Sequence, residues 1–195
     1  SGIIISGVNA LSSGLARFAQ QYVPVVVLDR NTAACSIASA LGHRTACVDV
    51  LDSDVYAEAA EEGFGRLLTA TRNEALNELI AQKAAIHLEP AEIYRISTGT
   101  NSESLIQPSS FVTNLAFGAD FLGPAAIRRL EKGTARLEVR QPPTQGMVPL
   151  LEVVDNGTGV RILTPEATPA ACHPVLCFVP AEADQPPSPA KETPP

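Results

Sequence analysis

Residues 3–12 read IIISGVNALS and combine a short apolar strand, a tight turn and the start of a helix. The strand ends at Gly7, and apolar residues recur at helical spacing directly after the turn. Free N–H groups and the dipole at the start of such a helix favour an anion. This order of elements is typical of the phosphate-binding turn in a dinucleotide-binding fold.

Beyond this turn, apolar strands alternate with amphipathic helices as far as residue 96. The expected strands cover residues 3–6, 24–28, 45–50, 66–71 and 92–96, and the expected helices cover 11–21, 32–41, 53–62 and 74–87. Alternation at this pitch predicts βαβ units with helices on both faces of a parallel sheet. The fold class is therefore α/β, with a Rossmann-like doubly wound parallel sheet over residues 1–97.

The second half has a different character and predicts a small α+β domain over residues 111–180. A linker rich in Ser, Thr and Asn covers 98–110, and the Pro-rich segment 181–195 is expected to be disordered. The expected elements of the small domain are a helix over 124–132 and strands over 135–140, 150–154, 160–163 and 175–179.

Composition excludes several classes of partner. The formal net charge of −7 and the lack of a basic cluster argue against nucleic acid. No apolar run is long enough to span a bilayer. The four cysteines suit a reducing compartment, and the spacing of Cys172, His173 and Cys177 fits no zinc pattern, so we expect no metal. A start at Ser1, two residues before a core strand, indicates a fragment of a larger protein.

The turn departs from the G-x-G-x-x-G pattern of dinucleotide-binding folds. Its three glycine positions are occupied by Gly7, Asn9 and Ser12. We expect the Asn9 side chain to crowd a pyrophosphate, which disfavours a dinucleotide more than a mononucleotide. Asn tolerates the left-handed backbone conformation, so the turn itself should persist.

Two carboxylates lie at the ends of the next two predicted strands. Asp29 lies 22 residues after Gly7, at the place of the acidic residue that binds an adenosine ribose diol. A carboxylate there repels a 2′-phosphate, which argues against NADP. Asp49 ends the third predicted strand and is expected near the adenine edge. Alternatively, both aspartates serve only as turn formers.

Together these residues resemble the TrkA-N domain, also called the KTN or RCK N-terminal domain, which regulates potassium channels and cation transporters. The resemblance covers residues 3–97 and rests on the Gly7 turn and on segments 25–31, 48–49 and 68–71, with Asn73 and Asn77. The turn sequence GVNAL is similar to the GANPL of a subgroup found in NhaP-like sodium/proton antiporters. Segments 115–118, 149–151 and 160–165 and the helix stop at Gly133 resemble the trailing domain of that subgroup more loosely.

This resemblance implies a regulatory domain on the cytoplasmic side of the cell membrane, preceded by a membrane antiporter domain and paired as a homodimer. The apolar helix over 75–86 offers a candidate dimer contact; alternatively, all of its apolar residues pack on the sheet. The implied ligand is an adenine nucleotide, either AMP, ADP or ATP, or NAD or NADH. The candidate cofactor-binding residues are Gly7, Val8, Asn9, Ala10, Leu11, Asp29, Arg30, Asp49, Val50 and Thr71.

The sequence contains no constellation of catalytic residues. Tyr22, Tyr56 and Tyr94 lack the lysine four residues later that a short-chain dehydrogenase needs, and no nucleophile elbow or phosphate loop is present. We therefore expect no enzyme. Two alternatives to a ligand sensor stay open: a structural dimerisation module with a decayed nucleotide site, and a small NAD-dependent oxidoreductase.

Overall fold

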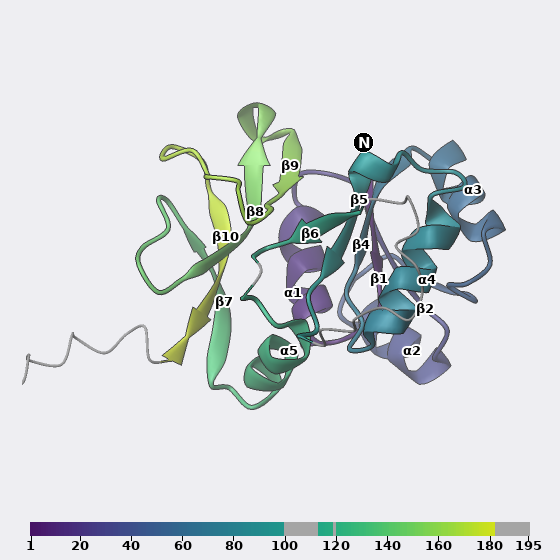
Figure 1. Ribbon diagram of the computed structural model, residues 1–195, viewed down its shortest axis with the longest axis horizontal. Helices are drawn as coiled ribbons and strands as arrows, with labels where there is room; N and C mark the ends of the chain where they lie inside the picture. The colour runs from purple at the N-terminus through teal and green to yellow at the C-terminus, as the bar shows by residue number, and fades with distance from the viewer. Residues whose placement is uncertain (100–112, 119, 182–195) are drawn as a thin grey trace, which may run out of the picture.

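A computed structural model describes residues 1–99, 113–118 and 120–181, which form two sheets (Figure 1). The strands of the first sheet are β1 (Gly2–Ser6), β2 (Val25–Asp29), β3 (Thr45–Cys47), β4 (Phe64–Thr69), β5 (Ile93–Ile96) and β6 (Asn114–Ala116). The helices between them are α1 (Ala10–Ala19), α2 (Thr32–Ala40), α3 (Asp54–Glu61) and α4 (Glu74–Ala84). The remaining elements are α5 (Gly123–Glu131), β7 (Ala135–Arg140), β8 (Val148–Val154), β9 (Gly159–Ile162) and β10 (Val175–Pro180), with 3-10 helices at Pro90–Glu92 and Asp155–Gly157.

The first sheet is parallel and has the strand order β3-β2-β1-β4-β5-β6. The chain winds outward from β1 through β2 to β3, then crosses to β4 and winds outward in the other direction. This order confirms the predicted Rossmann-like doubly wound sheet. A ligand in such a sheet binds at the carboxyl ends of the strands, where the winding reverses. In this chain that point lies between β1 and β4.

Side chains of the central strands alternate between two cores. Ile4 faces a core made with α3 and α4, which includes Tyr56 and Ile80. Ile3 and Ile5 face the opposite core, which contains residues of α1, α5 and the second sheet. All three isoleucines are almost fully buried, as expected for a strand covered on both faces.

The second sheet is antiparallel, with the order β7-β10-β8-β9. Together with α5 it forms the expected α+β unit, and it lies beside α1 in Figure 1. The close approach depends on Gly14 of α1, because a Cβ there would lie 2.1 Å from Cδ1 of Leu137 on β7. The rings of Phe121 and Phe178 meet edge to face at 5.4 Å in the same shared core.

The structure differs from the sequence-based expectation at two strands. Residues 114–116, assigned above to the small domain, instead form β6 and extend the parallel sheet beside β5. The third strand ends at Cys47 and not at Val50, so Asp49 lies in the loop that follows. The predicted linker falls mostly, and the predicted tail almost entirely, outside the described residues. Within the described ranges, no helix has the length and apolar character needed to cross a membrane.

Candidate functional site

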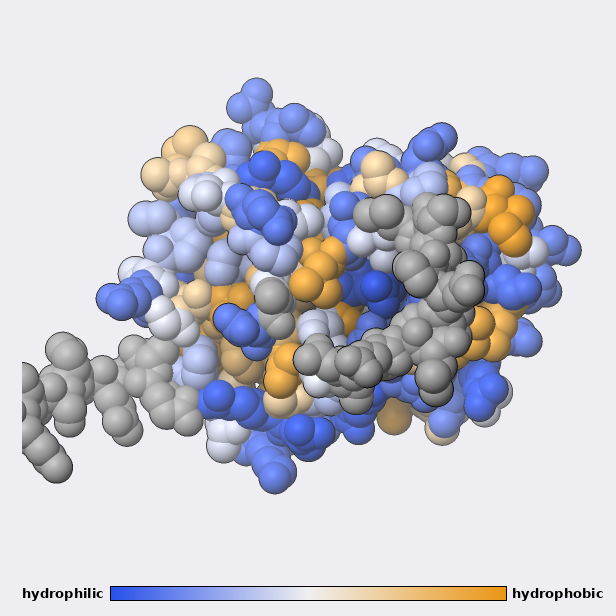
Figure 2. Space-filling model, viewed as in Figure 1, coloured by the Kyte–Doolittle hydropathy of each residue, from blue (hydrophilic) through white to orange (hydrophobic). Residues whose placement is uncertain are grey.

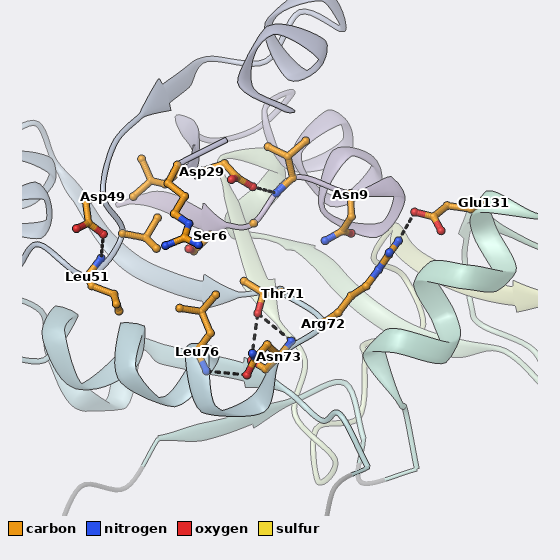
Figure 3. Close-up of a pocket in the computed structure, with 15 residues that line it drawn as sticks. Ser6, Asn9, Asp29, Asp49, Leu51, Thr71, Arg72, Asn73, Leu76 and Glu131 are labelled. Atoms are coloured by element: carbon orange, nitrogen blue, oxygen red, sulfur yellow. Dashed lines mark hydrogen bonds and ion pairs between the residues drawn. The ribbon is translucent and has the colours of Figure 1, made fainter. Parts of the chain in front are cut away.

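A cavity of about 400 Å³ lies at the carboxyl ends of β1, β2 and β4, where the winding of the sheet reverses (Figure 3). This volume is in the range of small-molecule sites. Four chain segments that each follow a strand supply most of the wall, and α4 and α5 complete it. The lining residues are Ser6, Gly7, Val8, Asn9, Leu28, Asp29, Arg30, Asp49, Val50, Leu51, Thr71, Arg72, Asn73, Leu76 and Glu131.

The turn after β1 requires glycine at position 7. Gly7 has a φ of +100°, in the region that favours glycine. A Cβ at this position would lie 3.0 Å from Cγ2 of Thr71 and 3.3 Å from the carbonyl oxygen of Ala70. The Gly7 N–H donates to the carbonyl of Leu28 at 2.8 Å, which joins the turn to β2. The first glycine of the motif is therefore explained by both conformation and space.

Asn9 uses its side chain to cap α1. Its Oδ1 accepts hydrogen bonds from the N–H groups of Leu11 and Ser12, each at 3.0 Å, and its Nδ2 donates to the carbonyl of Ala70 at 2.7 Å. The Ser12 hydroxyl in turn accepts from the Asn9 N–H at 2.8 Å, which completes a capping box. The expectation that Asn9 accommodates a left-handed turn is wrong, because its φ is −163° and Gly7 alone supplies the positive φ.

The cap changes what the turn can offer to an anion. Two of the helix N–H groups that a phosphate would use already donate to the Asn9 side chain. The N–H groups of Gly7, Val8 and Asn9 also have partners within the protein. A pyrophosphate at this turn would therefore compete with these internal hydrogen bonds.

Asp29 ends β2 with its carboxylate directed at the turn (Figure 3). Its Oδ2 accepts a hydrogen bond from the Val8 N–H at 2.8 Å, and its Oδ1 accepts one from the Asn31 N–H at 2.9 Å. Each carboxylate oxygen has about two acceptor sites, so each keeps one for a further donor. The side chain is half-buried and lines the cavity. This geometry is suited to two neighbouring hydroxyl groups.

Asp49 and its loop form the wall beside β2. Asp49 Oδ1 accepts from the Leu51 N–H at 3.0 Å, which closes a local turn. The hydroxyl of Tyr56 donates to the Val50 carbonyl at 2.7 Å and holds this loop against α3. Burial, followed by the nearby charge of Asp49, raises the pKa of Tyr56, so the hydroxyl keeps its proton and its role as donor. The hydrogen bond from Tyr56 therefore fixes the position of this loop relative to α3.

The wall beside β4 is organised by two asparagines that follow the strand. Asn77 Oδ1 accepts from the Thr71 N–H at 3.1 Å and from the Thr71 hydroxyl at 2.6 Å, while its Nδ2 donates to the Thr71 carbonyl at 3.1 Å. Asn73 caps α4 through the N–H of Leu76. Both asparagines therefore position Thr71 and α4, and Asn77 is itself fully buried.

Eight of the ten predicted site residues line the cavity, and Ala10 and Leu11 do not. Leu11 is buried in the core, whereas Ala10 lines a separate groove against the second sheet. Arg72 and Glu131, which were not predicted from the sequence, line the cavity and form an ion pair with each other. No local motif links these two residues, because they lie 59 positions apart.

Three carboxylates and two guanidinium groups line the cavity. The carboxylates belong to Asp29, Asp49 and Glu131, and the guanidinium groups to Arg30 and Arg72. Within residues 1–99, 113–118 and 120–181, no three His, Cys, Asp or Glu side chains gather as a metal site would require. The cavity is therefore lined both by hydrogen-bond acceptors and by cationic groups that can bind an anion.

A comparison with known families matches residues 3–110 to the TrkA-N domain, which is more than half of the chain. The chain belongs to the TrkA-N family. The matched residues include the turn after β1, Asp29 and Thr71, so all four strand ends that line the cavity lie within the TrkA-N domain. Among proteins with curated descriptions, none matches the chain significantly.

Solved structures resemble the TrkA-N chain at low sequence identity. The GsuK RCK domain is 14% identical with a TM-score of 0.45, covering 94% of this chain and 44% of that one. The GsuK channel bound to NAD is 13% identical with a TM-score of 0.44, covering 94% and 37%. The human SLO3 gating ring is 9% identical with a TM-score of 0.41, covering 92% and 44%. The chain spans less than half the length of each.

Proposed function

We propose that this TrkA-N domain is a ligand-sensing regulatory domain whose cavity binds an adenine nucleotide. The observation that carries the proposal is the position of Asp29, whose carboxylate lines a cavity at the point where the sheet winding reverses and keeps one acceptor site on each oxygen. An adenosine ribose presents two adjacent hydroxyl donors, which match this pair of acceptors. A GsuK channel structure with NAD bound is consistent with this ligand class.

The rest of the cavity supports a base beside the ribose. Leu28, Val50, Leu51 and Leu76 supply apolar side chains to its lining. A flat purine ring is suited to such a surface, with Asp49 at the edge of the same wall. The ring would lie on the β3 side of Asp29, and the phosphate would point toward the turn after β1.

The proposed context is a monovalent cation/proton antiporter. The domain would lie on the cytoplasmic side of the membrane, after a membrane antiporter domain, and would pair as a homodimer. A ligand that binds one arrangement of the domain better than another would bias the transporter by that difference in affinity. The support for an antiporter is the turn sequence after β1, with Asn9 in the place of the second glycine.

A specific observation favours a second candidate, a structural dimerisation module with no ligand. The Asn9 cap satisfies N–H groups that a nucleotide-binding turn would leave for phosphate. Calorimetric titration with AMP, ADP, ATP, NAD and NADH separates the candidates. Saturable heats with at least one nucleotide support the sensor, and their absence for all five supports the structural module. Steady oxidation of NADH in the presence of carbonyl substrates would instead indicate an oxidoreductase.

Light scattering tests the proposed pairing. The helix suggested for the contact buries Ile80 and Ala84 on the sheet and leaves Leu79 at 43% and Ile86 at 63% exposure. On the face shown in Figure 2, hydrophobic side chains of the described residues form separate groups among hydrophilic ones. A mass near twice 20.5 kDa supports pairing of this chain with a second copy of itself. A constant monomer mass at rising concentration would contradict it.

A further inference from the structure

The cavity holds an ion pair that joins the two structural units. Arg72 follows β4, and Glu131 is the last residue of α5. Their side chains form an ion pair, and both line the cavity (Figure 3). The guanidinium is 50% exposed and the carboxylate 43% exposed. A pair with this exposure contributes little free energy, so another anion can replace the carboxylate.

The strand order places Arg72 where the phosphate of a bound nucleotide would arrive. With the ribose on Asp29 at the end of β2, the 5′ side points across the turn after β1 toward the end of β4. β2 and β4 lie on either side of β1, two spacings of about 4.8 Å apart, a distance that a nucleotide and an extended arginine side chain cover together. The Asn9 amide bonds to Ala70, two residues before Arg72, so this arginine lies beside the turn.

The backbone N–H groups of the turn are mostly engaged within the protein, so they bind that phosphate less readily than Arg72 does. The N–H groups of Leu11 and Ser12 donate to the Asn9 side chain, and the N–H of Val8 donates to Asp29. A guanidinium binds phosphate through two parallel N–H donors and does not require these groups. Arg30 is the other arginine of the cavity, but it follows Asp29 directly, on the ribose side.

We propose that Arg72 binds the 5′-phosphate of the nucleotide and that its ion pair with Glu131 breaks when it does. This inference rests on the proposed nucleotide site and adds its anion-binding residue. It also links the ligand to the second unit, because α5 contacts both α1 and β7. Phosphate binding at Arg72 removes one ionic connection between the nucleotide-binding sheet and α5. A nucleoside without phosphate leaves that connection in place.

Calorimetry with adenosine and with AMP tests the proposal. The wild-type chain should bind AMP about tenfold or more tightly than adenosine, the usual gain from a charge-assisted hydrogen bond. Arg72→Gln should reduce this ratio to about threefold or less and leave the affinity for adenosine unchanged. Glu131→Gln should raise the affinity for AMP by about two- to fivefold, because it removes the competing carboxylate. The affinity for adenosine should not respond to Glu131→Gln.

Arg30→Gln is the matched control, since it removes the same charge from the same cavity. It should keep the ratio of AMP to adenosine affinity close to that of the wild type. An unchanged ratio in Arg72→Gln, or an equal loss in both arginine variants, would overturn the role of Arg72. An unchanged AMP affinity in Glu131→Gln would overturn the competition. If the wild-type chain binds neither ligand, the nucleotide site itself fails and this inference fails with it. Melting temperatures close to wild type will show that the variants are folded.

Discussion

The carboxylate of Asp29 accepts a hydrogen bond from the backbone N–H of Val8 at 2.8 Å. This bond joins the end of β2 to the turn after β1, so one side chain both shapes the turn and faces the cavity. A substitution at Asp29 will therefore change the proposed ligand contact and the local structure together, and the two effects have to be measured separately.

We predict that Asp29→Ala weakens the binding of adenosine and AMP by about 1 to 3 kcal/mol, the cost of losing hydrogen bonds to a charged group. Calorimetry gives the affinity, and a thermal melt gives the accompanying loss of stability. Glu58→Ala is the control, because it removes an exposed carboxylate outside the lining of the cavity. Equal affinities in Asp29→Ala and the wild type would remove Asp29 from the ligand site.

Substitution of Asn9 should change the preference between nucleotides. Asn9→Gly frees the N–H groups of Leu11 and Ser12, which can then donate to a pyrophosphate. The ratio of NAD affinity to AMP affinity should rise by about tenfold, the effect of one charge-assisted hydrogen bond. Titration with both nucleotides measures it. The loss of the cap itself should cost only a few tenths of a kcal/mol for glycine.

Asn9→Ala separates the two reasons for that change. Alanine removes the competing amide but keeps a Cβ at position 9. A rise in the NAD to AMP ratio in both variants indicates competition for the N–H groups, whereas a rise in Asn9→Gly alone indicates steric crowding. An unchanged ratio in both would contradict the interpretation of the cap.

The contact between Gly14 and Leu137 should control how tightly the two units pack. We expect Gly14→Val to destabilise the fold by about 1 to 3 kcal/mol, as overpacking of a core usually does. The cost should fall below about 1 kcal/mol in a Leu137→Ala background, because the clashing Cδ1 is then absent. Urea unfolding of the four proteins measures this coupling. Equal losses in the two backgrounds would contradict the predicted contact.

Glu152 should make stability depend on pH at the acid end. Burial alone would raise its pKa, but hydrogen bonds from the Ala170 N–H, Arg161 and His173 together outweigh burial and lower the pKa below its ordinary 4.5. The ionised carboxylate thus stabilises the fold fully above pH 4.5, and this contribution is lost as the pH falls through the lowered value. We predict that Glu152→Gln reduces the free energy of unfolding at pH 7 by about 1 to 3 kcal/mol. It should also flatten the acid limb, the part of the curve in which the free energy of unfolding falls as the pH is lowered.

Urea unfolding between pH 2.5 and 7 measures this dependence. Glu62→Gln is the control, since Glu62 forms an exposed ion pair with Arg44 and should leave the acid limb as steep as in the wild type. An acid limb of wild-type slope in Glu152→Gln would show that other carboxylates produce it.

Much of the nucleotide-binding half could be predicted from local patterns. The alternation of apolar strands with amphipathic helices indicates βαβ units, and each βαβ unit joins two parallel strands through its helix. Gly7 and Asp29 could be identified because Gly7 directly follows β1 and Asp29 ends β2, and parallel strands of one sheet end at the same edge. These inferences need only residues close together in the chain and a general rule about sheets.

Contacts between distant residues could not be predicted in this way. Residues 114–116 join the parallel sheet because the edge of β5 is available for pairing. Three residues are too few to show the alternation by which a strand is recognised in a sequence. Asn9 was expected to tolerate a left-handed conformation in the turn, but a capping bond to α1 and a second bond to Ala70 hold it extended. The pairing of Arg72 with Glu131, which lie 59 positions apart, depends on how α5 packs against α1. Periodicity and turn chemistry report the local conformation of a chain, whereas the ion pair in the wall of the cavity arises from the packing of two units against each other.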